Sequence, residues 1–284
     1  MSKRNLGILS ILLSAVCFAL MSFFVRASGD LPTMQKAFFR NAVAMVVIGI
    51  TLFRSGEGFL PKKGNIPYLM LRSVCGIIGI LGNFYAIDKM NISDANMLNK
   101  LSPFFAIIFS WLLLKEKAGK KEWGAVFMAF IGAMLVAKPS FRMESVPAMI
   151  GILGGMGAGA AYTFVRMVSQ RGERGSVIIF FFSVFSTLVT LPLMIADFEP
   201  MTAGQLLCLL AAGAAATGGQ IFITRAYSFA PAREISVFDY SQVIFAAVLG
   251  FIFLNQLPDI FSILGYVIII GAAVWKWRCN NMKA

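Results

Sequence analysis

Charged residues are scarce in this chain, and histidine is absent from it. Asp, Glu, Lys and Arg make up 13% of the 284 residues, about half of the ~25% share found in soluble domains. A water-soluble domain of this length would need more polar surface. Without histidine, a Cys-x-x-Cys motif or carboxylates at metal-ligand spacing, the sequence predicts neither a metal site nor a histidine-based catalytic centre.

Cysteines and nucleotide-binding motifs are equally sparse. Three of the four cysteines, Cys17, Cys75 and Cys208, fall inside apolar segments, and Cys279 lies near the C-terminal end. This distribution is typical of small apolar fillers rather than of a disulfide framework. The P-loop pattern G-x-x-x-x-G-K-[ST] does not occur, so the chain has no such ATP-binding motif of its own. We expect no cofactor and no enzymatic activity.

Hydrophobic residues, 58% of the chain, come in long blocks. The blocks are roughly 17–24 residues long and show no period-two alternation, which indicates membrane-spanning helices rather than barrel strands. We therefore predict an all-α integral membrane protein with ten transmembrane helices. The predicted spans cover residues 5–26, 34–53, 66–87, 93–114, 123–137, 148–169, 177–196, 204–225, 235–254 and 260–275.

Basic residues orient the predicted spans. If the N-terminus is cytoplasmic and the chain crosses ten times, 17 of the 25 lysines and arginines fall on the cytoplasmic side and 5 on the outer side. This bias follows the positive-inside rule. It predicts a multi-pass protein of the cytoplasmic membrane with both termini in the cytoplasm. The net charge of +12 then faces an anionic lipid leaflet. The expected partner is the lipid bilayer and not a nucleic acid.

The two halves of the sequence align at a constant shift of 140 residues. Phe24-Val25-Arg26 matches Phe164-Val165-Arg166, and single matches continue as far as the fourth and ninth predicted spans. We therefore expect residues 1–140 and 141–284 to be two five-helix repeats of inverted orientation, because an odd number of spans reverses the second copy. The repeat needs the first span, so we expect that segment to stay as a helix rather than to be cleaved as a signal peptide.

Polar side chains inside the predicted spans mark a candidate cavity, since such groups are costly in lipid. The fourth and ninth spans carry polar stripes at positions that the 140-residue shift relates, and further polar groups occupy the third, sixth and eighth spans. Asp239 is the carboxylate furthest inside a span, which makes it the candidate for a protonatable coupling group. The candidate substrate-cavity residues are Asn83, Tyr85, Asn96, Asn99, Lys100, Tyr162, Gln220, Ser236, Asp239 and Tyr240.

Each of these features has a structural alternative. Glycines four residues apart in the sixth span are typical of helix packing. Asn83 and Gln220 are also compatible with interhelical hydrogen bonds, and Arg40 with snorkelling towards the outer headgroups. Lys100 and Asp239 are compatible with a purely structural ion pair.

Longer motifs add a family resemblance that covers essentially the whole chain. Residues 84–88 (FYAID) and 93–105 (SDANMLNKLSPFF), Arg40 early in the second span, and Lys115-Glu116 after the fourth resemble the EamA-like branch of the drug/metabolite transporter superfamily. Asn255-Gln256 departs from the Gly-Glu that this family often repeats after the ninth span. The resemblance implies a small-metabolite transporter whose central cavity is lined by the helices equivalent to spans 1, 3, 4, 6, 8 and 9.

We therefore expect a secondary transporter that exports or exchanges a small molecule by alternating access, with a proton or another ion as a candidate coupling partner. An integral membrane enzyme acting on lipid is one alternative, although no cluster of acid, base or metal ligands supports it. A channel or passive facilitator is the other, and flux kinetics separate it from a carrier. Substrate identity, direction and oligomeric state stay open at this stage.

Overall fold

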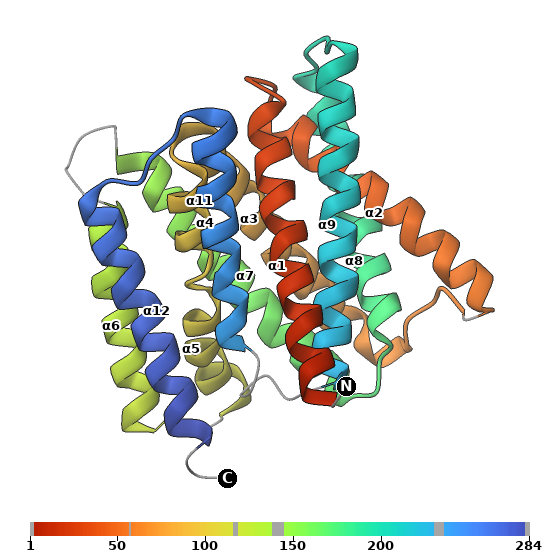
Figure 1. Cartoon of the computed structure of the whole chain (residues 1–284). Helices are drawn as coiled ribbons and strands as arrows, with labels where there is room; N and C mark the ends of the chain where they lie inside the picture. The colour runs from red at the N-terminus through yellow and green to blue at the C-terminus, as the bar shows by residue number, and fades with distance from the viewer. Residues whose placement is uncertain (1–2, 57, 116–118, 138–144, 230–235, 282–284) are drawn as a thin grey trace.

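Apolar helices account for the architecture of the chain (Figure 1). The computed structural model describes residues 3–56, 58–115, 119–137, 145–229 and 236–281, and the regular structure in this part is entirely helical. Seven of its helices are long and apolar enough to cross a membrane, and Trp123–Ala137 and Phe238–Leu254 form shorter apolar helices. The prediction of an all-α membrane protein is confirmed. The helices are α1 (Lys3–Ala27), α2 (Thr33–Ser55), η1 (Lys63–Asn65), α3 (Ile66–Lys89), α4 (Ile92–Asn99), α5 (Ser102–Leu114), α6 (Lys120–Ala137), α7 (Val146–Gln170), α8 (Gly175–Ala196), α9 (Ala203–Phe229), η3 (Ser236–Tyr240), α11 (Ser241–Leu254) and α12 (Ile260–Asn281).

The outer surface of the helical bundle is strongly apolar. Large side chains such as Phe127, Leu207 and Val267 expose 64–68% of their area. In water such a surface would drive aggregation, whereas in a bilayer it meets lipid tails. Polar groups occur instead in the interior, where Ser14, Asn96 and Lys36 are at most 1% exposed. This distribution agrees with lipid as the solvent of the fold.

The helices pack in pairs. α3 lies along α7, α1 along α9, α6 along α12, and α2 along α8. In Figure 1 the α6–α12 pair forms one edge of the bundle and the α2–α8 pair the opposite edge, with α1, α3, α4, α7 and α11 between them. α1 begins and α12 ends at the same end of the bundle, the lower end in Figure 1.

Glycines allow α7 to approach its neighbours at backbone distance. A Cβ atom on Gly82 of α3 would lie 2.8 Å from the Cα of Gly154 on α7. On the other side of α7, a Cβ on Gly155 would lie 2.7 Å from the carbonyl of Leu98, and one on Gly159 would lie 2.7 Å from that of Ser102. The helix-packing interpretation of the sixth-span glycines is therefore confirmed, and α7 supports both α4 and α5.

The fourth span is broken and the ninth changes from a 3₁₀ helix to an α-helix, which the prediction of continuous helices over 93–114 and 235–254 missed. α4 ends at Asn99 and α5 begins at Ser102, with Pro103 in its first turn. Proline has no N–H to bond the carbonyl of Asn99 four residues earlier, so the helix is interrupted there. In the ninth span the 3₁₀ helix η3 ends at Tyr240, where α11 begins. The start of that predicted span, residue 235, lies outside the described residues.

Candidate functional site

The break in the fourth span and the 3₁₀ segment of the ninth meet inside the bundle. Lys100, the residue after α4, donates a hydrogen bond from Nζ to Oδ2 of Asp239 at 2.5 Å, and both side chains are nearly buried. The N–H groups of Phe104 and Phe105 bond to the carbonyl of Leu101. The Lys100 carbonyl at the break instead accepts a hydrogen bond from the Tyr240 hydroxyl at 3.2 Å. The Lys100 carbonyl freed by the break is thus bound by a side chain of η3, as a buried polar group requires.

Asn96 connects α4 to two further helices. Its Oδ1 accepts hydrogen bonds from Ser22 of α1 at 3.0 Å and from Gln242 of α11 at 2.5 Å. Its Nδ2 donates to the carbonyl of Ile92 at 2.7 Å. Because Asn96 has no exposed surface, its amide holds α1, α4 and α11 together rather than facing an open space.

Beside the α4–α5 break lies a cavity with a volume of about 100 Å³. Residues of α1, α2, α3, α4, α7, α8, α9 and α11 line it together with Lys100, whereas α6 and α12 contribute none of its lining. Its wall combines three cationic side chains with amides, one phenol and several aromatic rings. The lining residues are Phe18, Met21, Arg40, Arg72, Gly76, Gly79, Ile80, Asn83, Phe84, Asn99, Lys100, Ala158, Ala161, Tyr162, Phe182, Gln220, Ile223 and Gln242.

Half of the residues predicted from the sequence line this cavity. They are Asn83, Asn99, Lys100, Tyr162 and Gln220. Asn96, Asp239 and Tyr240 stand behind the wall, bonded to Gln242 or to Lys100.

The remaining two predicted residues are Tyr85 and Ser236. Tyr85 lies half-buried on α3 and is not part of the lining. Ser236 is the first residue of η3, and its side chain lies outside the described residues.

Arg40 and Arg72 are the charged cavity residues that the set of predicted site residues lacks. They are 5% and 7% exposed. Their guanidinium carbons lie 5.8 and 3.6 Å from the centre of the Phe182 ring. The sequence does indicate these residues, because an arginine inside an apolar span is rare and its presence there predicts a functional site. Snorkelling was the competing interpretation for Arg40, and the burial of its side chain excludes it.

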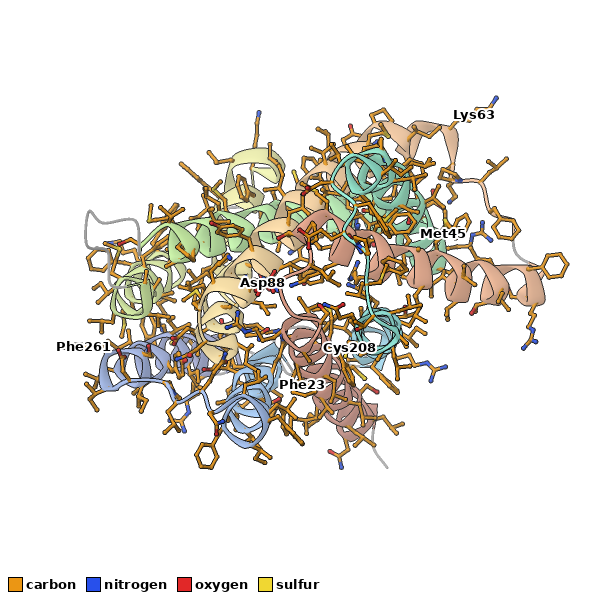
Figure 2. The ribbon with its side chains drawn as sticks, turned by 90° about the horizontal axis from the view of Figure 1, so that it is seen from above. Phe23, Met45, Lys63, Asp88, Cys208 and Phe261 are labelled. Carbon is orange, nitrogen blue, oxygen red and sulfur yellow. The ribbon has the colours of Figure 1, made fainter. Side chains whose placement is uncertain are left out.

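Each end of the bundle carries a polar cluster. At the upper end in Figure 1, Lys36 of α2 donates to Asp88 of α3 at 2.6 Å and to the carbonyl of Gly29 at 2.7 Å. Seen along the bundle, Asp88 lies towards the centre, whereas Lys63 and Phe261 lie at the edge (Figure 2).

At the other end, the carboxylate of Glu173 accepts hydrogen bonds from the backbone N–H of Lys62 and the side chain of Asn65, at 2.9 and 3.0 Å. Burial alone would raise the pKa of Glu173, but these hydrogen bonds outweigh it and lower the pKa below its ordinary value. Glu173 therefore ties the α7–α8 connection to the α2–α3 connection.

An apolar bundle that encloses a polar cavity beside a broken helix is typical of a membrane transporter, because irregular backbone at membrane depth occurs where it lines a cavity. A sequence model of the EamA-like transporter family matches residues 5–138 and again 148–276. The chain belongs to the EamA-like transporter family.

Individual relatives agree with this assignment. The chain is 34% identical to the pseudopaline exporter CntI of Pseudomonas aeruginosa over 271 residues, 94% of each chain. It is 28% identical to human solute carrier family 35 member G1, over 96% of this chain and 80% of the relative. An uncharacterized transporter of Helicobacter pylori is 27% identical over 93% and 92% of the two chains. Together with the fold, they identify a secondary membrane transporter.

A solved crystal structure shares the fold. It superposes with a TM-score of 0.68 over 98% of this chain and 99% of the other, at 15% sequence identity. At this identity the likeness shows the fold alone.

Proposed function

We propose that this protein exports or exchanges a small metabolite across the cytoplasmic membrane by alternating access, with the central cavity as its binding site. One observation carries the proposal: the cavity lies beside the helix break at Lys100, and Lys100 contacts the η3–α11 junction at Tyr240, whose position differs by the 140 residues of the sequence repeat. Discontinuous helices at corresponding positions of two repeats are typical of substrate sites in secondary transporters.

Backbone conformation supports the division into repeats 1–140 and 141–284. α5 and α11 both end at a left-handed residue, Lys115 with φ 53° and Asn255 with φ 51°. The N–H of each bonds to the carbonyl five residues earlier, Ser110 and Gly250 respectively. Left-handed conformations are unfavourable for residues other than glycine, so their recurrence at a shift of 140 residues is unlikely to be accidental.

Helix packing supports the same division. Exchanging the first and second halves turns the α3–α7 pair into the α9–α1 pair, and both pairs are present. The same exchange maps α2–α8 and α6–α12 onto themselves. Such packing is expected of two copies related by a two-fold axis. With five spans in each copy, the axis lies in the membrane plane and the second copy is inverted.

The charged residues support an orientation of the protein in the membrane and a candidate group for proton coupling. With the basic connections in the cytoplasm, the Lys36–Asp88 end of the bundle faces outward and the Glu173 end faces inward. Lys100 stands at the cavity wall and is paired there with Asp239. Protonation of Asp239 would release Lys100, which makes this carboxylate our candidate for proton coupling.

The name of the Pseudomonas aeruginosa relative, an exporter, favours outward transport of the substrate. A passive facilitator would use the same cavity without alternating closure. The two differ in counterflow, because a carrier exchanges labelled for unlabelled substrate faster than it completes net transport, and an open pore does not.

The test uses the full chain in proteoliposomes. A thermal-unfolding screen first identifies a stabilising solute, and vesicles loaded with that solute are then given the labelled form outside. We expect saturable counterflow, strongly reduced by Lys100→Met and unchanged by Lys63→Gln at the edge of the bundle. Flux that never saturates and shows no exchange would contradict the carrier mechanism.

A further inference from the structure

Two buried arginines stand at the cavity without an acidic partner. The carboxylate of Asp239 pairs with Lys100, and no acidic residue is among the cavity-lining residues. Within the part of the chain that the structure describes, neither Arg40 nor Arg72 forms an ion pair. Nε of Arg40, and both Nε and Nη1 of Arg72, are buried there without a hydrogen-bond acceptor.

Leaving a buried guanidinium unpaired is costly. Nη1 of Arg40 donates to Oδ1 of Asn41 at 2.6 Å, and the Phe182 ring faces Arg72 at 3.6 Å. These contacts orient the two side chains but supply no negative charge. Arg40 and Arg72 also repel each other electrostatically. The wall of the cavity therefore carries two uncompensated positive charges.

The site is built rather than incidental. Arg40 lies about two turns after the start of α2 and Arg72 about two turns after the start of α3, so consecutive helices bring them in from opposite ends of the bundle. Gly76 makes room for Phe182 and Arg72: a Cβ there would lie 2.7 Å from the Phe182 ring and 3.3 Å from Nη1 of Arg72. Glycine at this position lets the ring and the guanidinium pack against α3.

We infer that the cavity binds a small organic anion, whose carboxylate or phosphate oxygens accept hydrogen bonds from Arg40 and Arg72. Guanidinium groups match the oxygen pairs of these oxyanions bidentately. The apolar part of such a solute would lie against Phe18, Met21 and Phe84, which complete the wall. This inference rests on the proposed function, because it names the substrate class of the proposed transport site.

The first test is the thermal unfolding of purified full-length protein with three solutes of similar length at constant ionic strength: glutarate, its dimethyl ester and cadaverine. A fourth solute, glycerol 3-phosphate, separates phosphate from carboxylate recognition. We expect glutarate, glycerol 3-phosphate or both to raise the unfolding temperature, and the ester and the diamine to leave it unchanged. Stabilisation by the diamine or the ester alone, or by none of the four, would overturn the inference.

The second test uses variants. Arg40→Gln and Arg72→Gln should weaken binding of the stabilising anion by about tenfold or more, the loss of roughly one desolvated charged contact. Arg72→Lys keeps the charge without the forked donor and should fall between the wild type and Arg72→Gln. Arg54→Gln removes the same charge from the exposed end of α2 and should bind as the wild type does. Unchanged affinity in both cavity variants would overturn the inference.

Transport separates this inference from the proposed function. Binding of the anion that depends on the two arginines, without counterflow in proteoliposomes, would contradict the transporter mechanism and leave the anion site standing. Saturable counterflow of a cationic or neutral solute, with no anion binding, would leave the transporter standing and refute the anion site.

Discussion

The ion pair between Lys100 and Asp239 is the single contact on which the site depends most. Lys100 lies at the wall of the cavity and at the break of the fourth span, and Asp239 belongs to η3 in the ninth. Buried ion pairs contribute little net stability, but removing one partner leaves an uncompensated charge. The contact therefore couples the two halves through a charge that a proton can cancel.

At this pair we predict strong coupling between substitutions. Asp239→Asn should lower the free energy of unfolding by about 3–5 kcal/mol, because the ammonium of Lys100 stays buried without its partner. The double variant Lys100→Met/Asp239→Asn should recover most of that loss. Chemical unfolding of the four proteins forms the double-mutant cycle. Additive effects would show that the two side chains do not interact in the folded protein.

The same variant tests proton coupling. If Asp239 carries the proton, Asp239→Asn abolishes the dependence of transport on a pH gradient while exchange at equal pH continues. Transport assays in vesicles with and without the gradient measure this. Gradient-driven transport that survives in Asp239→Asn would assign the proton to another group.

Glu173 makes the stability of the α7–α8 connection dependent on pH. Its pKa is lowered in the folded protein, so its contribution is present above the ordinary glutamate value of about 4.3 and is lost as the pH falls through the folded pKa. We predict that Glu173→Gln unfolds at a lower temperature than the wild type at pH 7. The difference should shrink below about pH 4. A difference that is constant over this range would show that the carboxylate charge is not involved.

At the level of the elements, glycine decides how closely helices approach. α3 and α7 meet at Gly82 and Gly154, with backbone in contact with backbone. The same helices carry Arg72, Asn83 and Tyr162 to the cavity, so their separation sets its width. A side chain at the crossing would push the cavity wall apart.

We predict that Gly82→Ala destabilises the protein by about 1–3 kcal/mol, as overpacking does in well-packed interiors. Gly271→Ala on α12 is the matched control, because a Cβ there meets nothing within 4 Å. It should be neutral or slightly stabilising, since alanine has the higher helix propensity. Equal thermal stability of the two variants would show that α3 and α7 can move apart freely.

The elements also show what sequence patterns can and cannot predict. Hydrophobic blocks predicted the helices and most of their ends, because lipid leaves the backbone few alternatives. The interruption at Lys100 was missed, since Pro103 alone is compatible with a kink. The hydrogen bond from Tyr240, 140 residues away, to the Lys100 carbonyl at the break is a tertiary contact that no local pattern shows.

The cavity itself was predicted in part for a similar reason. Periodicity found Asn99 and Lys100 because they share a polar stripe. Periodicity could not distinguish Asn96, whose side-chain amide is hydrogen-bonded to other residues of the protein, from a residue that lines the cavity. Arg40 and Arg72 converge only through the tertiary approach of α2, α3 and α8 around Phe182.

At the level of the whole molecule, the distribution of basic residues predicts the orientation of the protein in the membrane. Gly29 and Phe198 lie in connections at the upper end in Figure 1, and Gly172 lies at the opposite end. We predict that reporter fusions at Gly29 and Phe198 score external and that a fusion at Gly172 scores internal. A clear reversal at any one of these positions would remove the inverted arrangement of the two halves.

The central claim is that the cavity is exposed alternately on the two sides of the membrane. This claim connects the repeats, the break in the fourth span and the transport function. The most direct measurement is the reactivity of a single cysteine at Asn99, in a background without the four native cysteines, towards a membrane-impermeant thiol reagent applied from one side at a time. A cysteine at Val248, which is half exposed on the outer surface of α11, is the control. We predict labelling of position 99 from both sides, with protection by substrate and with opposite changes on the two sides when a gradient favours one state. Labelling from one side alone under every condition, or from both sides without any effect of substrate, would contradict alternating access.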